Sequence, residues 1–369
     1  MAKKAYIGVG GVARKVKKGY IGVDGVARKI KKAYIGIGGV ARPCWGGGKP
    51  EAYGTITSLN VAVWQNAAAN VGDYLLFGGG AAAWNGSPQQ IVTAYNKSLT
   101  VTTPTNMNGA RYELSGVSLD SLAFFAGGYY SSSSARSEVD SYNTDLTRNY
   151  NNLFTSRAEM AAARVGGQAV FAGGYANGAQ SRVEAYDSSL THTSNLSLSQ
   201  ARYGAAGCSV GNYALVAGGY YRSVLTSVET FNTSLTRSTA TDLSVGRYKM
   251  NGISHAGYTL VIGGWDGGGS VEVYNASLTH TVLSSTVVKS YTRGSSVGEY
   301  ALVHGGRDEN WGMYSDVIMF DKSLTCTTAQ PLSSARWGES AGTIGNFILF
   351  AGGGDTNTAT NTVDAYILD

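Results

Sequence analysis

The stretch YALVAGG at residues 213–219 decides the fold of this chain of 369 residues. It is an apolar run of strand length that ends in a pair of glycines. Similar runs recur along the chain, and their glycine pairs begin at Gly79, Gly127, Gly173, Gly218, Gly263, Gly305 and Gly352. Seven copies, 42 to 48 residues apart, predict a radial array of four-stranded blades. The expected fold is therefore all-β, a seven-bladed β-propeller.

A second motif follows most glycine pairs. It is a Tyr or Phe, then Asn or Asp, then x-Ser-Leu-Thr, as after Tyr186, Phe231 and Tyr274. An Asn or Asp in this position turns the chain by hydrogen bonding to its own backbone, so the motif predicts a hairpin. Stretches of small residues precede the next apolar run, and they suit the crowded innermost strand of a blade.

Together these motifs resemble the kelch family of β-propellers. The resemblance covers residues 53–369 and rests on the glycine pairs, on Val-Glu-x-Tyr at residues 183–186 and 271–274, and on an Arg sixteen residues before most glycine pairs. The sequence departs from the family where the Leu of Ser-Leu-Thr replaces a Trp. The resemblance implies the propeller fold, with different packing at that position.

The ends of the chain predict how the ring closes. The last repeat stops at its third strand, Val363 to Tyr366, and residues 53–59 precede the first complete repeat. Pairing these two segments completes the seventh blade and removes exposed strand edges. We therefore expect the propeller to occupy residues 53–369, with residues 47–52 as a Gly- and Pro-containing linker.

Residues 1–46 have a different repeat and a different charge. Units of 14 residues begin at Ala5, Gly19 and Ala33, and each one reads as a strand, a tight turn and a second strand. Residues 1–49 carry 12 Lys or Arg against Asp24 alone, whereas the remainder has 17 basic and 23 acidic residues. Hairpins this small need other chains, so we expect oligomerisation, as a homotrimer, or docking to a partner.

The basic side chains of this segment, among them Arg14, Lys15, Lys17 and Lys18, are expected to keep strand edges soluble. A nucleic-acid or anionic-surface patch is the alternative, but no aromatic residues suited to base stacking accompany the charge. The Gly- and Lys-rich repeats resemble those at the start of tail proteins in phages and prophages of Gram-positive hosts. That resemblance implies a virion attachment segment that binds other tail proteins.

Composition excludes several classes of protein. Glycine is plentiful at 51 residues, but there are only 5 prolines and no three-residue period, so the chain is not collagen-like. Cys44, Cys208 and Cys326 form neither a disulfide framework nor a metal motif, and the four His are isolated. No apolar stretch approaches 18 residues, so we expect no membrane insertion. We expect neither a metal nor a cofactor.

The candidate ligand site lies where one face of the propeller gathers basic and aromatic side chains. Six of the seven positions sixteen residues before a glycine pair are basic: Arg111, Arg157, Arg202, Arg247, Lys289 and Arg336. Aromatic residues follow several of them and several glycine pairs: Tyr112, Tyr203, Tyr248 and Trp337, then Tyr129, Tyr175, Tyr220, Trp265 and Trp311.

Two interpretations of these residues stay open. The arginines either stabilise blade ends by bonding loop carbonyls, with the aromatics packed between loops, or they form a ligand platform. Aromatic rings stack on sugars, and guanidinium groups hold carboxylate or phosphate. Glu113 and Glu159, near the same mouth, are a possible acid and base. No sialidase motif and no clustered His accompany them, so we expect no enzyme.

The expected function is that of a tail-associated receptor-binding protein of a phage or prophage. Its propeller would recognise a host cell-surface glycan or cell-wall polymer. The protein would be made in the bacterial cytoplasm and reside in the virion tail. The alternatives are a structural tail or baseplate protein whose propeller docks another virion protein, and a sugar-modifying enzyme.

Overall fold

The computed structural model describes residues 48–83, 86–266, 270–284, 289–355 and 357–368, together with the backbone of the strands within residues 6–45. It contains two compact units. One comprises Met1–Glu51 with Leu368–Asp369, and the other comprises Ala52–Ile367. Each unit is considered by itself.

The N-terminal unit contains the three hairpins that the 14-residue repeat predicts. Their strands pair antiparallel, β1 with β2, β3 with β4 and β5 with β6. The bounds are β1 Tyr6–Val9, β2 Val12–Lys15, β3 Tyr20–Val23, β4 Val26–Lys29, β5 Ala33–Ile37 and β6 Val40–Trp45. The turns of these hairpins, the lysines at 17 and 18 and all side chains of the repeats lie outside the described residues, and so do the contacts expected of them.

The larger unit is a seven-bladed β-propeller of seven four-stranded antiparallel sheets, as the glycine-pair repeat predicts. The innermost strands are β8 Ala67–Val71, β12 Ser115–Ser118, β18 Ala161–Val165, β22 Ala206–Val210, β28 Asn251–His255, β32 Arg293–Val297 and β36 Trp337–Ile344. The second strands are β9 Tyr74–Gly78, β13 Ala123–Ala126, β19 Gln168–Ala172, β23 Tyr213–Ala217, β29 Tyr258–Ile262, β33 Tyr300–His304 and β37 Phe347–Gly354.

The outer half of each blade is a hairpin. The third strands are β10 Val92–Asn96, β16 Glu138–Tyr142, β20 Gln180–Asp187, β26 Val228–Asn232, β30 Ser270–Asn275, β34 Val317–Asp321 and β38 Val363–Ile367. The fourth strands are β11 Val101–Thr102, β17 Arg148–Asn152, β21 His192–Arg202, β27 Arg237–Ala240, β31 His280–Ser284, β35 Cys326–Ala329 and β7 Glu51–Thr55. Two short hairpins follow glycine pairs: β14 Tyr129–Ser131 with β15 Ser134–Ala135, and β24 Tyr220–Tyr221 with β25 Ser223–Val224.

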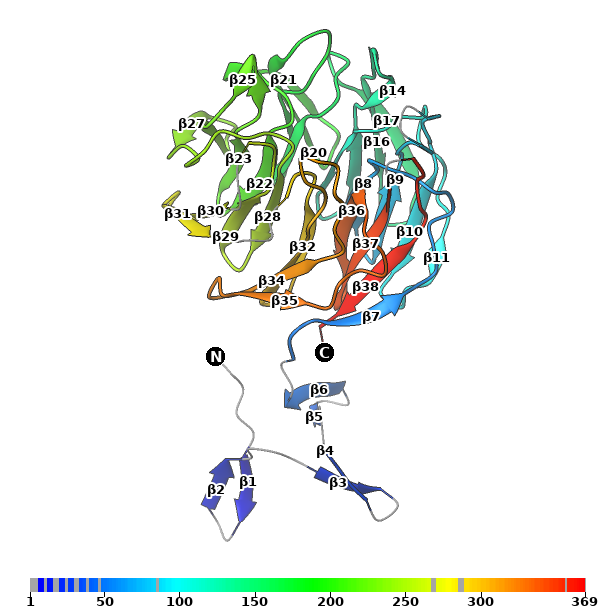
Figure 1. The fold of residues 1–369 in the computed structure, drawn as a ribbon, viewed down its shortest axis with the longest axis vertical. Helices are drawn as coiled ribbons and strands as arrows, with labels where there is room; N and C mark the ends of the chain where they lie inside the picture. The colour runs from blue at the N-terminus through cyan, green and yellow to red at the C-terminus, as the bar shows by residue number, and fades with distance from the viewer. Residues whose placement is uncertain are drawn as a thin grey trace. The chain divides into compact units, whose positions relative to one another are not determined.

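The innermost strands form a closed ring, because each one contacts the innermost strand of the next blade and β36 returns to β8. In Figure 1 the strands β8, β22, β28, β32 and β36 lie toward the middle of the propeller, while β11, β27, β31 and β35 lie at its periphery. Small residues permit the close approach at the centre. A Cβ added at Gly207 would lie 2.3 Å from the carbonyl oxygen of Ala162 on the neighbouring blade.

The seventh blade joins the two ends of the propeller sequence. Its sheet order is β36, β37, β38, β7, so the outer strand comes from the N-terminal end. β7 begins at Glu51, inside the segment expected to be a linker. Beyond β7, the N–H groups of Ile56 and Leu59 donate to the carbonyls of Val363 and Asn361. The pairing with the last strand therefore runs through residues 53–59, as ring closure requires.

The two ends of the propeller have different loops. The links from second to third strand, which contain the glycine pairs, open at the same end as the links between blades; we call this end the glycine-loop face. The tight turns within each hairpin open at the opposite end, the turn face. There the Oδ1 atom of Asn232 accepts from the N–H groups of Ser234 and Thr236. The x-Ser-Leu-Thr motif thus forms the turn that the sequence predicts.

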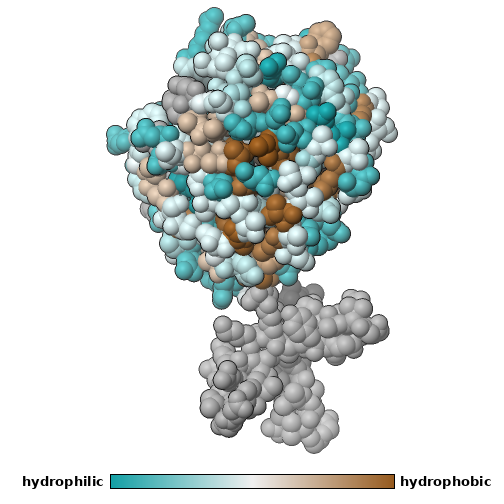
Figure 2. Space-filling model, turned by 90° about the vertical axis from the view of Figure 1, so that its right-hand side faces the viewer, coloured by the Kyte–Doolittle hydropathy of each residue, from teal (hydrophilic) through white to brown (hydrophobic). Residues whose placement is uncertain are grey.

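The core lies between neighbouring blades. Phe124 of the second blade and Phe171 and Tyr186 of the third pack together and are fully or almost fully buried. The outside of the propeller is mixed: in Figure 2 brown hydrophobic residues gather in separate groups among white and teal ones. Among the described residues, no helix is long and apolar enough to cross a membrane.

Candidate functional site

Five of the six predicted basic residues are buried ion-pair partners at the ends of blades. Each guanidinium contacts a carboxylate on the third strand of its own blade at 2.5 to 2.9 Å, and each arginine side chain is at most 1% exposed. The pairs are Arg111 with Asp140, Arg157 with Glu184, Arg202 with Glu229, Arg247 with Glu272 and Arg336 with Asp364.

These arginines also donate to backbone carbonyls. Arg202, for example, bonds the carbonyls of Gly218 and Ser227. Of the two interpretations of the sequence, the structure favours the first, in which these arginines stabilise the ends of the blades. A guanidinium that is fully buried and already paired offers no surface to a ligand, so the structure favours a supporting role for these five arginines over ligand contact.

The two blades without such an arginine support the same conclusion. Val63 and Lys289 occupy the equivalent positions, and their third strands carry Thr93 and Ile318 where the others carry a carboxylate. A buried charge without its partner is strongly destabilising, so arginine and acid are present or absent together. Lys289 is half-buried, and its Nζ lies 4.7 Å from the centre of the Tyr314 ring.

The predicted aromatic residues do gather on the glycine-loop face. In six of the seven blades the residue fifteen positions before the glycine pair bonds through its backbone to the residue after that pair, as in Tyr112 with Tyr129, Tyr203 with Tyr220 and Tyr248 with Trp265. In the seventh, Trp337 pairs with Gly354 at the end of β37. This pairing explains why two distant stretches of each repeat open at one end.

The aromatic side chains form two main clusters. Tyr175, Tyr203, Tyr220 and Tyr248 are linked by ring contacts of 5.1 to 6.4 Å. Trp265, Tyr291, Trp311, Trp337 and Trp64 form the second cluster, with contacts of 5.0 to 6.4 Å. Among the predicted residues, Tyr129 and Trp337 are buried, Trp311 is exposed, and Tyr112, Tyr175, Tyr203, Tyr220, Tyr248 and Trp265 are half-buried.

Next to the aromatic residues, a collar of equivalent residues surrounds the axis of the propeller. It comprises the residue fourteen positions before each glycine pair: Gln65, Glu113, Glu159, Gly204, Lys249, Tyr291 and Gly338. Six backbone N–H groups of the collar donate to the carbonyl of the collar residue in the preceding blade, at 2.6 to 3.4 Å. All seven have positive φ, between 50° and 72°. Five non-glycine residues in this conformation indicate that the ring of hydrogen bonds fixes the backbone there.

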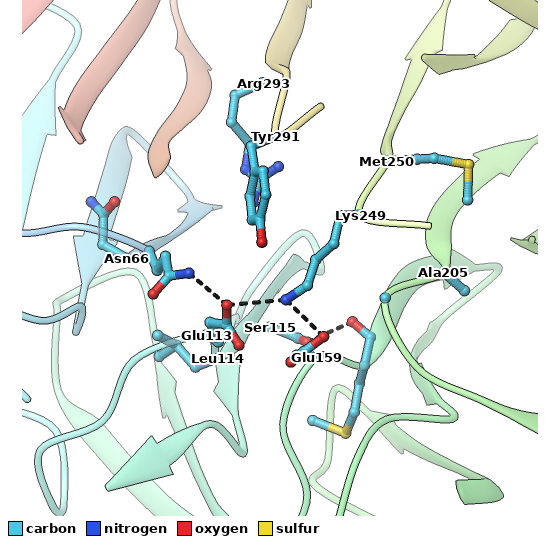
Figure 3. A pocket seen from close by; sticks show the side chains of 13 residues that line it. Asn66, Glu113, Leu114, Ser115, Glu159, Ala205, Lys249, Met250, Tyr291 and Arg293 are labelled. Atoms are coloured by element: carbon cyan, nitrogen blue, oxygen red, sulfur yellow. Dashed lines mark hydrogen bonds and ion pairs between the residues drawn. The ribbon is translucent and has the colours of Figure 1, made fainter. Parts of the chain in front are cut away.

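The collar side chains border a cavity of about 120 Å³ (Figure 3). Lys249 points between two carboxylates, with its Nζ 3.0 Å from Glu113 Oε1 and 2.7 Å from Glu159 Oε2. Gln65 donates from Nε2 to the same oxygen of Glu113 at 2.5 Å. Arg293 completes the charged lining. The sequence points to Glu113 and Glu159 as a pair. It does not point to Lys249, the lysine that contacts both of them.

Burial and the neighbouring charge of Glu113 raise the pKa of Glu159 to about 7, although Lys249 opposes this shift. Burial alone would lower the pKa of Lys249, but the two carboxylates raise it well above its ordinary value. The lysine therefore stays charged, and Glu159 changes protonation near neutrality.

The cavity is better suited to holding charge than to binding a metal. Lys249 occupies the space between the two carboxylates. Among the described residues, no group of three or more His, Cys, Asp or Glu is placed to hold a metal ion.

No family model matches this chain, and a search of curated proteins finds no match. The fold and the arrangement of the glycine-loop face are therefore the basis for a function.

Proposed function

We propose that the propeller is a recognition module whose glycine-loop face binds a glycan. The observation that carries this proposal is the difference between the two faces. The glycine-loop face holds both aromatic clusters and the exposed Tyr130, Phe154 and Trp311. The turn face instead exposes ion pairs such as Lys97 with Asp73 and Lys322 with Glu299.

The exposed aromatics have the form of sugar platforms. Phe154 is 70% exposed and Tyr130 is 50% exposed. Each has a guanidinium 4.6 Å from its ring centre, from Arg182 and Arg136 respectively. A rigid ring that costs little side-chain entropy to immobilise suits stacking on a sugar, and the adjacent N–H donors suit hydroxyl or anionic groups. Large apolar side chains exposed on one face of a domain mark an interaction site.

We propose binding rather than catalysis. Lys249 contacts both carboxylates of the cavity, so its side chain lies between them, where a glycosidase pair would hold the bond to be cleaved. A turnover assay on the oligosaccharides that the protein binds tests this part. Hydrolysis that Glu159→Gln abolishes would contradict it.

The biological setting that we propose is the tail of a phage or prophage. The support is the resemblance of residues 1–46 to tail-protein repeats, and those residues would attach the propeller to other tail proteins as a homotrimer. The host glycan would then be a cell-surface or cell-wall polymer. Light scattering on the full chain tests the oligomer, and a monomer at micromolar concentration would contradict it.

Binding of the purified chain to host cell wall and to a glycan array tests the proposed function. We expect Phe154→Ala, Tyr130→Ala and Trp311→Ala to weaken binding, each by about 1–3 kcal/mol if stacking on a sugar resembles stacking on other flat rings. Lys97→Ala and Lys322→Ala, on the turn face, are the matched controls and should have no effect. Binding that only the control variants weaken would place the site on the turn face. Binding to another tail protein and to no glycan would favour the docking alternative.

A further inference from the structure

Arg307 occupies a position that four of the other six blades fill with an aromatic residue. It follows the Gly305–Gly306 pair, and the equivalent residues include Tyr129, Tyr175 and Trp265. Its backbone pairs with Ser290, as those residues pair with their own partners. The sixth blade therefore presents a guanidinium within the aromatic layer of the glycine-loop face.

Four aromatic rings lie close to this guanidinium. Its Cζ is 3.7 Å from the ring centre of Trp311, 4.5 Å from Trp337, 4.9 Å from Tyr291 and 5.1 Å from Trp265. Ring faces attract the positive charge, but they do not accept the N–H groups that radiate in the guanidinium plane. The cage holds the cation and leaves its hydrogen-bonding edge unused.

The side chain of Arg307 lacks the partners that every other buried arginine at the blade ends has. The residue is 3% exposed, and within the described parts of the chain no carboxylate forms an ion pair with it. Its Nε and Nη1 atoms are buried without a hydrogen-bond acceptor. Buried charges are normally paired, so this unpaired guanidinium indicates a missing anion.

We propose that Arg307 binds the carboxylate of an acidic saccharide, an inference that rests on the proposed glycan-binding function. A guanidinium matches a carboxylate with two parallel hydrogen bonds. A carboxylate is planar and can lie in the guanidinium plane between the rings, whereas a phosphate carries oxygens out of that plane. The observations therefore favour a uronic-acid type of sugar.

Two neighbours complete this subsite. Trp311, the nearest ring, is 47% exposed, so it offers a stacking surface, and a rotation of its side chain would open the guanidinium to the ligand. Lys289 stands at the start of the same blade and is half-buried; it interacts electrostatically with Asp308, but among the described residues no carboxylate contacts it directly as an ion-pair partner. It provides a second positive charge for an acidic chain.

The test compares trigalacturonic acid with its methyl ester, which keeps the sugar rings and loses the charges. We expect the full-length protein to bind the acid at least tenfold more tightly than the ester, with an affinity that falls as salt rises. Arg307→Tyr introduces the residue that three other blades carry at this position, so we expect the variant to keep the fold. It should remove the preference for the acid while leaving binding of the ester unchanged.

Three results would overturn the inference: equal binding of acid and ester by the native chain, binding of neither, or an acid preference that persists in Arg307→Tyr. Arg164→Ala, which removes an exposed arginine paired with Asp120 on the turn face, controls for a general loss of positive charge. Equal binding of both probes that Phe154→Ala weakens would refute the carboxylate subsite and keep the proposed function. If the native protein binds no glycan at all, both the carboxylate subsite and the proposed function are refuted.

Discussion

The guanidinium of Arg202 and the carboxylate of Glu229 lie 2.7 Å apart, and each side chain is 1% exposed. The pair joins the start of a blade to its third strand. Without Arg202, the buried carboxylate of Glu229 would keep only the more exposed Arg237, at 3.1 Å, as its counter-charge. We expect Arg202→Ala to lower the free energy of unfolding by about 3–5 kcal/mol, measured by urea denaturation.

The chain itself supplies the matched control for this variant. The first blade is built with Val63 and Thr93 at the two positions. The double variant Arg202→Val with Glu229→Thr should therefore recover most of the stability that either single change loses. A double variant as unstable as the sum of the two single changes would show that the two residues are not coupled, and it would contradict this prediction.

Glu159 should make stability depend on pH near neutrality. Its pKa is raised from 4.5 to about 7 on folding, so the folded state holds a proton that the unfolded state releases at lower pH. This contribution is fully present below pH 4.5 and is lost as pH rises through about 7. In thermal melts of Glu159→Gln, this fall in stability with rising pH should disappear. Exposed Glu309→Gln should keep it, and an unchanged slope in Glu159→Gln would contradict the assignment.

Glu272 should have the opposite effect to Glu159: stability should fall as the pH is lowered into the acid range. Burial would raise its pKa, but hydrogen bonds from Ser244 and His280 and the charge of Arg247 hold it below 4.5. Its stabilising contribution is present above that value and is lost as pH falls through the lower, folded pKa. Ser244→Ala removes a donor to the carboxylate, so we expect a loss of about 1.5–3 kcal/mol at pH 7 and acid unfolding at higher pH.

Ser234 is the control, because the turn there uses its backbone N–H and not its hydroxyl. Ser234→Ala should leave both the stability at neutral pH and the acid transition as they are. Identical acid transitions in the two variants would rule out the role given to Ser244.

Ring closure predicts a sharp boundary for truncation. Removing residues 1–50 keeps β7, so the propeller should remain a monomer with a cooperative melt. Removing residues 1–59 takes away β7 and the bonds to Val363 and Asn361, which exposes the edge of β38. We expect the shorter chain to aggregate, as judged by light scattering. Equal behaviour of the two truncations would show that β7 does not stabilise the ring.

The sequence predicts the blades well because their signals are local. A glycine pair that ends an apolar run, and an Asn that turns the chain within five residues, need no knowledge of distant partners. The role of the buried arginines is harder to predict from the sequence, because their carboxylate partners lie more than twenty residues away, on the third strand of the same blade. The signal was nevertheless present: Val63 and Lys289 lack an acid two residues before the aromatic of the third strand, and the five arginines have one.

The cavity and the Arg307 cage depend on ring geometry that no single repeat contains. Lys249 meets Glu113 and Glu159 only because the collar brings three blades to one axis. Arg307 is visible in the sequence as a cation in a position of aromatics, but its lack of a partner appears only when Trp265, Trp311 and their neighbours are placed around it.

The position of β7 has a mechanical consequence. Residue 50 leads directly into this strand, so any tension carried by the N-terminal segment enters the propeller through the outer strand of the seventh blade. The strand that closes the ring is thus also the first strand that such tension would reach. Under load, its hydrogen bonds to β38 are the first to be strained, and the propeller opens at this seam before any blade is torn from within.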